Sequence, residues 1–174
     1  MTTKGFYEYS DEELNAETTF DQLPEGTYHL RVRDFEVSSW SDGRPRLEIM
    51  TEVVSGSQAS RYGPRHTWTL GDYDGTTKDG REFHIDGEAE QKKLVREVTR
   101  VRNGKTITIT NPSQYDSAML QEIGEQIKGD EFIGVVALKN GYPRIQSRGI
   151  HSMASPPKSF TSAEKVSNFS LENV

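Results

Sequence analysis

The sequence predicts a mostly β domain of the α+β class, a small five-stranded barrel with one or two helices between its third and fourth strands. Two observations support this fold class. Short segments of alternating apolar and polar residues are separated by glycine-containing turns, and helical periodicity is confined to the middle of the chain. A split sheet packed on one helix would give the same order of elements, so both architectures stay open at this point.

The first predicted strand, residues 27–38, follows the turn Leu23-Pro24-Glu25-Gly26. Its apolar side chains change parity along the strand, from even positions to odd ones. They are Tyr28, Leu30 and Val32, then Phe35 and Val37. Such a change is what an inserted residue, a β-bulge near Asp34, produces. We therefore expect this strand to bend and to serve two sides of the barrel.

The other strands are predicted from alternation and from turn residues. They are residues 45–54, a short segment with His66, Trp68 and Leu70, and the final hairpin of residues 132–138 and 142–148. The turns are Ser41-Asp42-Gly43 before the second strand and Asn140-Gly141 in the final hairpin. Residues 71–86 contain three glycines and no alternation, which predicts a loop.

Two helices are predicted between the third and fourth strands. Asp86 is placed to cap a helix over residues 87–102, with an apolar stripe of Leu94, Val95, Val98 and Val101. The dipeptide Asn103-Gly104 leaves a hairpin within residues 95–110 as the alternative. A second helix is expected to start with Asn111 as its cap, Pro112 at its first position and Gln114 in a capping box, and to stop at Gly129.

Composition divides the chain into three regions: an acidic flexible leader (1–21), the barrel-like domain (22–151) and a disordered tail (152–174). Residues 1–25 carry seven acids and one base, which equals the whole net charge of −6, so the rest of the chain is neutral. The absence of cysteine excludes disulfides and thiolate metal sites. With neither a signal peptide nor a membrane span in the sequence, we expect a cytoplasmic protein.

Several short motifs carry a resemblance to a known family. They are Leu23-Pro24-Glu25-Gly26-Thr27-Tyr28, the turn Asp42-Gly43, the segment Leu47-Glu48-Ile49 and the segment Gly129-Asp130-Glu131-Phe132-Ile133-Gly134. Over about residues 22–150 the chain resembles bacteriophage single-stranded-DNA-binding proteins of the OB-fold type, from replication and recombination cassettes. The resemblance implies a host-cell cytoplasmic protein that binds single-stranded DNA. Phage replication or recombination proteins and a second copy of the chain are further candidate partners.

The candidate nucleic-acid-binding residues are those that a five-stranded barrel places near its second and third strands and the adjoining loops. They are Trp40, Arg44, Arg46, Tyr62, Arg65, Tyr142 and Arg144. Trp40 is expected either as a stacking platform for a base or as a rim residue, whereas Trp68 is expected in the core. The base-rich run from Lys92 to Lys105 is interpreted as a solvated helix face, with contact to a nucleic-acid backbone as the alternative.

Other functions have weaker support in the sequence. One alternative is a protein-interaction module or inhibitor that does not bind DNA and uses its acidic leader as a DNA mimic. A minor alternative is a metal-dependent nuclease, because Glu90 and Lys92 have the acid-x-lysine spacing of some nucleases, with Asp79 or Asp86 upstream. No nucleophile has a visible base partner and the four histidines lack metal spacing, so we expect neither an enzyme nor a cofactor or metal site.

Overall fold

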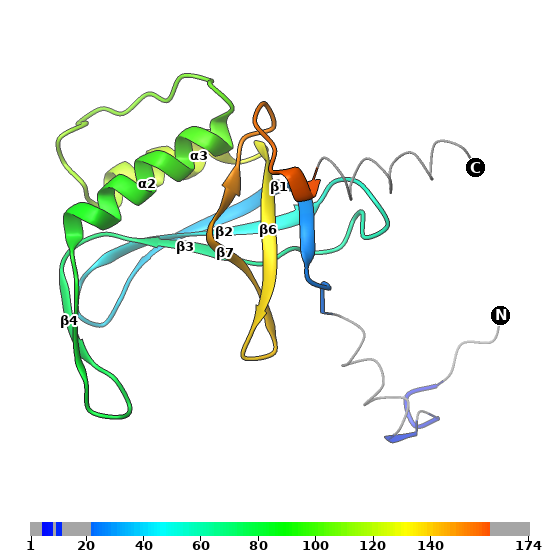
Figure 1. Ribbon diagram of the computed structural model, residues 1–174. Coiled ribbons are helices and arrows are strands. Elements are labelled where there is room, and N and C mark those ends of the chain that lie inside the picture. Colours follow the sequence, from blue (N-terminus) through cyan, green and yellow to red (C-terminus); the bar gives the residue numbers. More distant parts are fainter. Residues whose placement is uncertain (1–4, 9, 12–21, 161–174) are drawn as a thin grey trace.

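A computed structural model of the chain describes residues 5–8, 10–11 and 22–160 (Figure 1), so most of the acidic leader and the end of the tail lie outside the described residues. The strands are β1 (Gly26–Ser39), β2 (Pro45–Val53), β3 (His66–Thr69), β4 (Tyr73–Thr76), β5 (Glu82–Ile85), β6 (Glu131–Lys139) and β7 (Tyr142–His151). The helices are α2 (Gly87–Arg102) and α3 (Ser117–Ile127).

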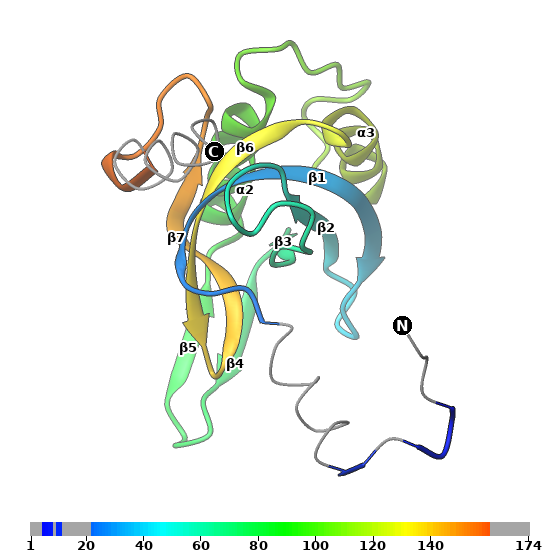
Figure 2. The same cartoon turned by 90° about the vertical axis from the view of Figure 1, so that its right-hand side faces the viewer.

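Five strands form one antiparallel sheet in the order β3-β2-β1-β6-β7, and β4 and β5 form a separate hairpin. The central strand β1 is shared between two partners: its first part, from Gly26 to Arg31, pairs with β6, and the part from Leu30 to Ser39 pairs with β2. Figure 2 shows that β1 is strongly arched. Within the described residues no ladder joins β3 to β7, so the predicted closure into a barrel is not observed.

The predicted bulge in β1 is confirmed. The register of β1 against β2 shifts between Val32 and Asp34, where the apolar side chains change parity. Val32 is buried before the shift, and Phe35 packs against the core after it. The extra residue lets one strand direct apolar side chains inward on both sides of its bend.

The core lies between the concave face of the sheet and the two helices. α3 packs on β1 and β2, whereas α2 packs on β6, β7 and β3. Trp68 and Tyr28 are buried, as predicted, together with Leu30, Leu47 and Phe132. Because α2 contacts both edge strands of the sheet, it spans the gap that backbone hydrogen bonds leave open.

The helix over residues 87–102 is confirmed, and the alternative hairpin is therefore excluded. The carboxylate of Asp86 accepts a hydrogen bond from the Glu88 amide, and Asn103 ends the helix in the left-handed conformation. One detail of the predicted stripe is wrong. Val95 is 52% exposed, and its place on the buried side is taken by Glu97.

The predicted start of the second helix is wrong. α3 begins at Ser117, where the Asp116 carboxylate accepts a hydrogen bond from the Met119 amide. The segment before it stays outside the helix because Ile107 and Ile109 pack against the core from an irregular path. Asn111 closes only a single turn, in which its carbonyl accepts from the Gln114 amide.

The prediction of a loop over residues 71–86 is also wrong, because β4 and β5 pair there. The hairpin projects away from the helices (Figures 1 and 2) and is held by a contact between the rings of Tyr73 and Phe83, whose centroids are 5.9 Å apart. Its aspartates and glycines have low strand propensity, which explains why its sequence does not show alternation.

The first residues of the predicted tail belong to the described part. Residues 152–157 form turns and irregular backbone, residues 158–160 are helical, and the hydroxyls of Ser159 and Thr27 lie 2.8 Å apart. The amide of Met153 donates to the Asn103 side chain. Residues 161–174, the rest of the predicted tail, lie outside the described residues. None of the helices in the described residues has the length and apolar character needed to cross a membrane.

Replacing Gly124 by alanine is predicted to destabilise the protein, although alanine favours helices. A Cβ on Gly124 would overlap the ring of Phe35 on β1, so α3 would have to move away from the sheet. We expect the Gly124→Ala variant to lose about 1–3 kcal/mol of unfolding free energy in urea denaturation. Gln121→Ala on the exposed side of α3 is the control and should change it by less than about 0.5 kcal/mol. A stabilised Gly124→Ala protein would contradict the proposed packing.

Candidate functional site

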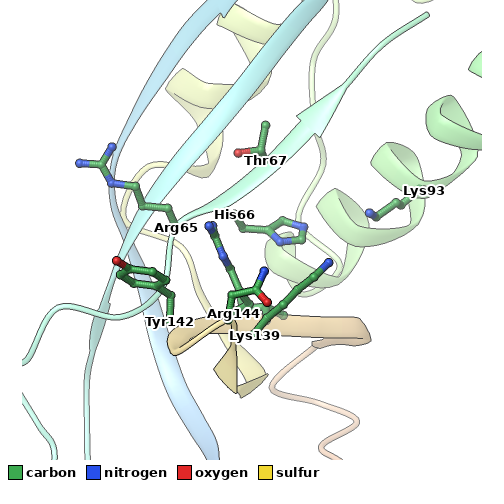
Figure 3. A pocket seen from close by; sticks show the side chains of 9 residues that line it. Arg65, His66, Thr67, Lys93, Lys139, Tyr142 and Arg144 are labelled. Atoms are coloured by element: carbon green, nitrogen blue, oxygen red, sulfur yellow. The ribbon is translucent and has the colours of Figure 1, made fainter. Parts of the chain in front are cut away.

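A cleft among the described residues lies between the unpaired edges of β3 and β7, beneath α2. It has a volume of about 560 Å³. Figure 3 shows that side chains from β3, α2, β7 and the β6–β7 turn surround it. The lining residues are Arg65, His66, Thr67, Lys93, Lys139, Asn140, Tyr142, Arg144 and Ile145.

Positive charge dominates this cleft. Lys93, Lys139 and Arg144 come from three different elements, and their side chains form no hydrogen bond or salt bridge within the described part of the chain. Arg65 also lines the cleft, but its guanidinium turns toward Glu48 at 3.0 Å. Three cations thus face one space without a hydrogen-bond or salt-bridge partner, although the charge of Lys93 also acts on the nearby Glu97, and this arrangement favours an anionic ligand.

A buried carboxylate lies behind His66, which lines the cleft. Glu97 of α2 is 2% exposed, and one of its oxygens accepts two hydrogen bonds. The donors are Nε2 of His66 at 2.8 Å and Nε1 of Trp68 at 2.9 Å. The rings of His66 and Trp68 meet edge to face, so Glu97 fixes the one histidine that faces the cleft.

The groups around Glu97 determine whether its carboxyl group is ionised. Burial opposes its ionisation and would raise its pKa, but the hydrogen bond and charge of His66 act in the other direction. With the hydrogen bond from Trp68 and the charge of Lys93, they hold the pKa of Glu97 below its ordinary value of 4.5. At neutral pH the cleft therefore has an ionised carboxylate behind its ring of cations.

A second group of predicted residues lies at the β1–β2 turn. Trp40 is 42% exposed, and its Nε1 donates to the hydroxyl of Thr69 at 3.0 Å. The guanidinium of Arg46 lies 4.2 Å from the centre of the Trp40 ring and also donates to Ser38. One face of the indole is thus covered and its edge is fixed, which are the features of a rigid stacking platform.

This platform is adjacent to the cleft. Thr69, which holds Trp40, and Thr67, which lines the cleft, are two positions apart on the same face of β3. Two residues of a strand span about 7 Å. A ligand lying along the edge of β3 would therefore reach both the cations and the exposed indole.

The seven residues predicted from sequence do not all meet. Arg65, Tyr142 and Arg144 line the cleft, and Trp40 and Arg46 form the platform. Tyr62 lies beside Glu52, six residues along β2 from Arg46 and thus about 20 Å away.

Arg44 is engaged near the platform instead of facing the cleft. Its guanidinium pairs with Asp42 at 2.8 Å and lies 4.1 Å from the centre of the Tyr73 ring at the start of the β4–β5 hairpin. Tyr62 is similarly covered by another arginine, since the guanidinium of Arg33 lies 4.4 Å from its ring centre.

Sequence reasoning did not find Lys93, Lys139, His66 or Glu97 as site residues. Within the base-rich run, Arg102 and Lys105 bind the buried Asp130, and Lys92 pairs with Glu88 on the helix surface. Only Lys93 of these faces the cleft. The sequence does contain a signal that Glu97 is buried: it lies three residues after Leu94 and four residues before Val101, and therefore on the apolar stripe of the helix.

The nuclease alternative gains no support from the geometry. Glu90 and Lys92 lie near the start of α2, as expected, and not on a strand. No three histidine, aspartate or glutamate side chains among the described residues are grouped so that they could hold a metal ion.

Comparison with protein-family models finds no matching family, and comparison with curated proteins finds no match either. The chemistry of the site is therefore argued from its geometry: cations for phosphate oxygens, hydroxyls along β3, and two exposed aromatic rings, Trp40 and Tyr142, beside them.

Replacing Glu97 by glutamine is predicted to destabilise the protein by about 1–3 kcal/mol at neutral pH, because a buried hydrogen-bonded charge is lost. Since folding lowers the pKa of Glu97, its ionised form stabilises the protein above pH 4.5 and this contribution disappears as the pH falls further. The difference in unfolding free energy between wild type and variant should therefore shrink in acid. Urea denaturation over a pH series measures it. Glu125→Gln on the surface of α3 is the control, and a difference independent of pH would contradict the assignment.

Proposed function

We propose that this protein is a binding module for single-stranded nucleic acid, with single-stranded DNA as the expected ligand. The observation that carries the proposal is the placement of three unpartnered cations, Lys93, Lys139 and Arg144, next to the exposed Trp40 along one strand edge. Phosphates need a cationic surface and unpaired bases need flat side chains, and a single strand offers both groups together.

The fold gives this proposal a second line of support. We propose that the five-stranded sheet is an OB-like barrel that stays open between β3 and β7. The order β3-β2-β1-β6-β7, with β1 shared by two partners and a helix before β6, is the strand order of that fold. In OB-folds the ligand lies near the second and third strands, flanked by the loops that correspond here to residues 40–44 and 139–142.

The cations of the cleft and the ring of Trp40 would contribute to binding in different ways. Each cation that neutralises a phosphate releases counterions and makes binding sensitive to salt. Each base stacked on an aromatic ring contributes about 1–3 kcal/mol with little sequence preference. Binding of this kind would protect or present single-stranded DNA during phage replication or recombination, as the resemblance of residues 22–150 to phage proteins suggests.

Single-strand binding predicts that labelled oligo-dT binds more tightly than a duplex of the same length, and that the affinity falls as salt increases. Lys93→Gln and Arg144→Gln should each weaken binding and lower the slope of log K against log salt by about 0.7, because each removes one phosphate contact. Fluorescence anisotropy at several salt concentrations measures both quantities.

The matched control for these variants is Lys92→Gln. Lys92 is next to Lys93 in sequence but points away from the cleft, and it pairs with Glu88 at 3.6 Å on the exposed side of α2. The Lys92→Gln variant should leave the slope of log K against log salt unchanged, although it removes the same formal charge as Lys93→Gln. Equal affinity for duplex and single strand, or equal effects of the Lys92 and Lys93 substitutions, would reject the cleft as the binding site. Failure of every oligonucleotide to bind would favour the alternative of a protein-interaction module.

The stacking role of Trp40 predicts that oligo-dT quenches tryptophan fluorescence and that Trp40→Ala weakens binding by about 1–3 kcal/mol. The variant should stay folded, because Trp40 lies at the rim. Trp68→Ala should instead lower the free energy of unfolding by about 3–5 kcal/mol, since its ring is buried. Thermal denaturation and titration of both variants distinguish the roles. Unchanged affinity of a folded Trp40→Ala protein would remove the platform from the model.

A further inference from the structure

The positive charge along the binding path is concentrated at one place. Lys93, Lys139 and Arg144 meet in the cleft, whereas the path along β3 toward Trp40 carries the hydroxyls of Thr67 and Thr69 and the guanidinium of Arg46, which lies over the indole. An internal phosphodiester has a single negative charge, so a path for a continuous strand would be expected to distribute its cations. Three unpartnered cations around one space instead match a group with more than one negative charge.

Helix α2 bounds one side of the cleft in which these cations meet. α2 packs on β3, β6 and β7 and thereby covers the far side of the space between the two edge strands. Behind His66 lies the ionised Glu97, which would repel a phosphate that moved further inward. The packing of α2 and the charge of Glu97 therefore favour a strand whose end, and not its middle, lies beside Lys93.

We propose that the cleft binds the terminal phosphate of a single-stranded nucleic acid, with the strand extending along β3 to Trp40. This inference rests on the proposed single-strand binding and specifies which part of the ligand the cleft receives. The chemical class is a phosphomonoester at a strand end, which carries a charge of about −1.5 to −2 at neutral pH and three acceptor oxygens. The ammonium groups of Lys93 and Lys139 and the Arg144 guanidinium are the donors available to it.

The positions of two aromatic residues fit a strand that begins with its terminal phosphate in the cleft and runs along β3. Tyr142 is 63% exposed at the mouth of the cleft, where its ring can contact the terminal sugar or base. Trp40 lies further along β3 and would stack on a base that follows. Terminal phosphate recognition thus requires both ends of the path: the cations fix the end of the strand, and the indole holds a neighbouring base.

The experiment compares three fluorescently labelled short oligo-dT strands of equal length, which carry a 5′-phosphate, a 3′-phosphate or no terminal phosphate, with the dye attached at an internal base. The full-length protein is titrated by anisotropy. We expect the strand with the favoured phosphorylated end to bind about tenfold more tightly than the unphosphorylated strand, because it adds hydrogen bonds between charged groups. The two phosphorylated strands show which end the cleft receives.

Substitution localises the preference. Lys93→Gln should reduce the advantage of the phosphorylated strand to about twofold or less. Lys92→Gln should leave the advantage intact, and so should Trp40→Ala, although the latter weakens binding of all three strands. An advantage that survives Lys93→Gln would place the terminal phosphate elsewhere and overturn the proposal.

The outcomes separate this inference from the function on which it rests. Equal affinities for the three strands would overturn terminal phosphate binding and leave single-strand binding intact, whereas no binding of any strand would overturn the proposed function itself. Unlabelled thymidine monophosphate serves as a competitor for the labelled strand. It should compete weakly because it lacks the bases that reach Trp40, and competition as strong as that of the phosphorylated strand would identify a free-nucleotide site instead.

Discussion

The constraint on which the structure depends is the division of β1 between two partners. One strand pairs with β6 over its first part and with β2 over the remainder, and the register shift between Val32 and Asp34 supplies the bend that this requires. The bend carries the outer strands β3 and β7 around toward each other without bringing them into hydrogen-bonding distance along a ladder. The cleft is the space that remains. The positions of the cations that line the cleft therefore depend on the bulge in β1, although none of these cations lies on β1.

Helix α2 connects the two edge strands, β3 and β7, that no hydrogen-bond ladder joins, and Glu97 makes its contact with β3. A helix cannot continue the hydrogen bonds of a sheet edge, so α2 joins the edge through side chains: Glu97 accepts from His66 and Trp68 on β3, while Arg100 donates to the carbonyl of Ile150 on β7. The buried carboxylate is tolerated because both of its contacts are donors and one can carry a charge. The same helix then presents Lys93 one turn earlier on the cleft side. Structural closure and the candidate binding surface thus come from one face of one helix.

The sequence was sufficient for the features that depend on local patterns. The strands of the sheet, the bulge, the cap at Asp86 and the burial of Trp68 were predicted because alternation, parity and turn residues are properties of neighbouring positions. The predicted start of α3 was wrong because the sequence offers two N-cap residues, Asn111 and Asp116. The packing of Ile107 and Ile109 against the core favours the later start at Asp116. The cleft needs Lys93, Lys139 and Arg144 together, and their proximity depends on the curvature of the sheet, which no local pattern encodes. Arg65, Tyr142 and Arg144 were still found, because they flank predicted strand ends.

A net charge of −6 does not oppose an anionic ligand, because charges separated by more than about 8–10 Å are largely screened at physiological ionic strength and the local arrangement decides. That arrangement also selects the route of the ligand. On the outer face of the sheet Glu36 lies directly opposite Glu48, beside Arg46, and Glu36 has no salt bridge within the described residues. A phosphate backbone crossing β1 and β2 would meet the carboxylate of Glu36, whereas beside β3 the carboxylate of Glu48 is neutralised by Arg65 and accepts a hydrogen bond from Thr67. Negative charge on the open face and positive charge at the strand edge therefore favour a ligand that runs along β3 over one that crosses the sheet.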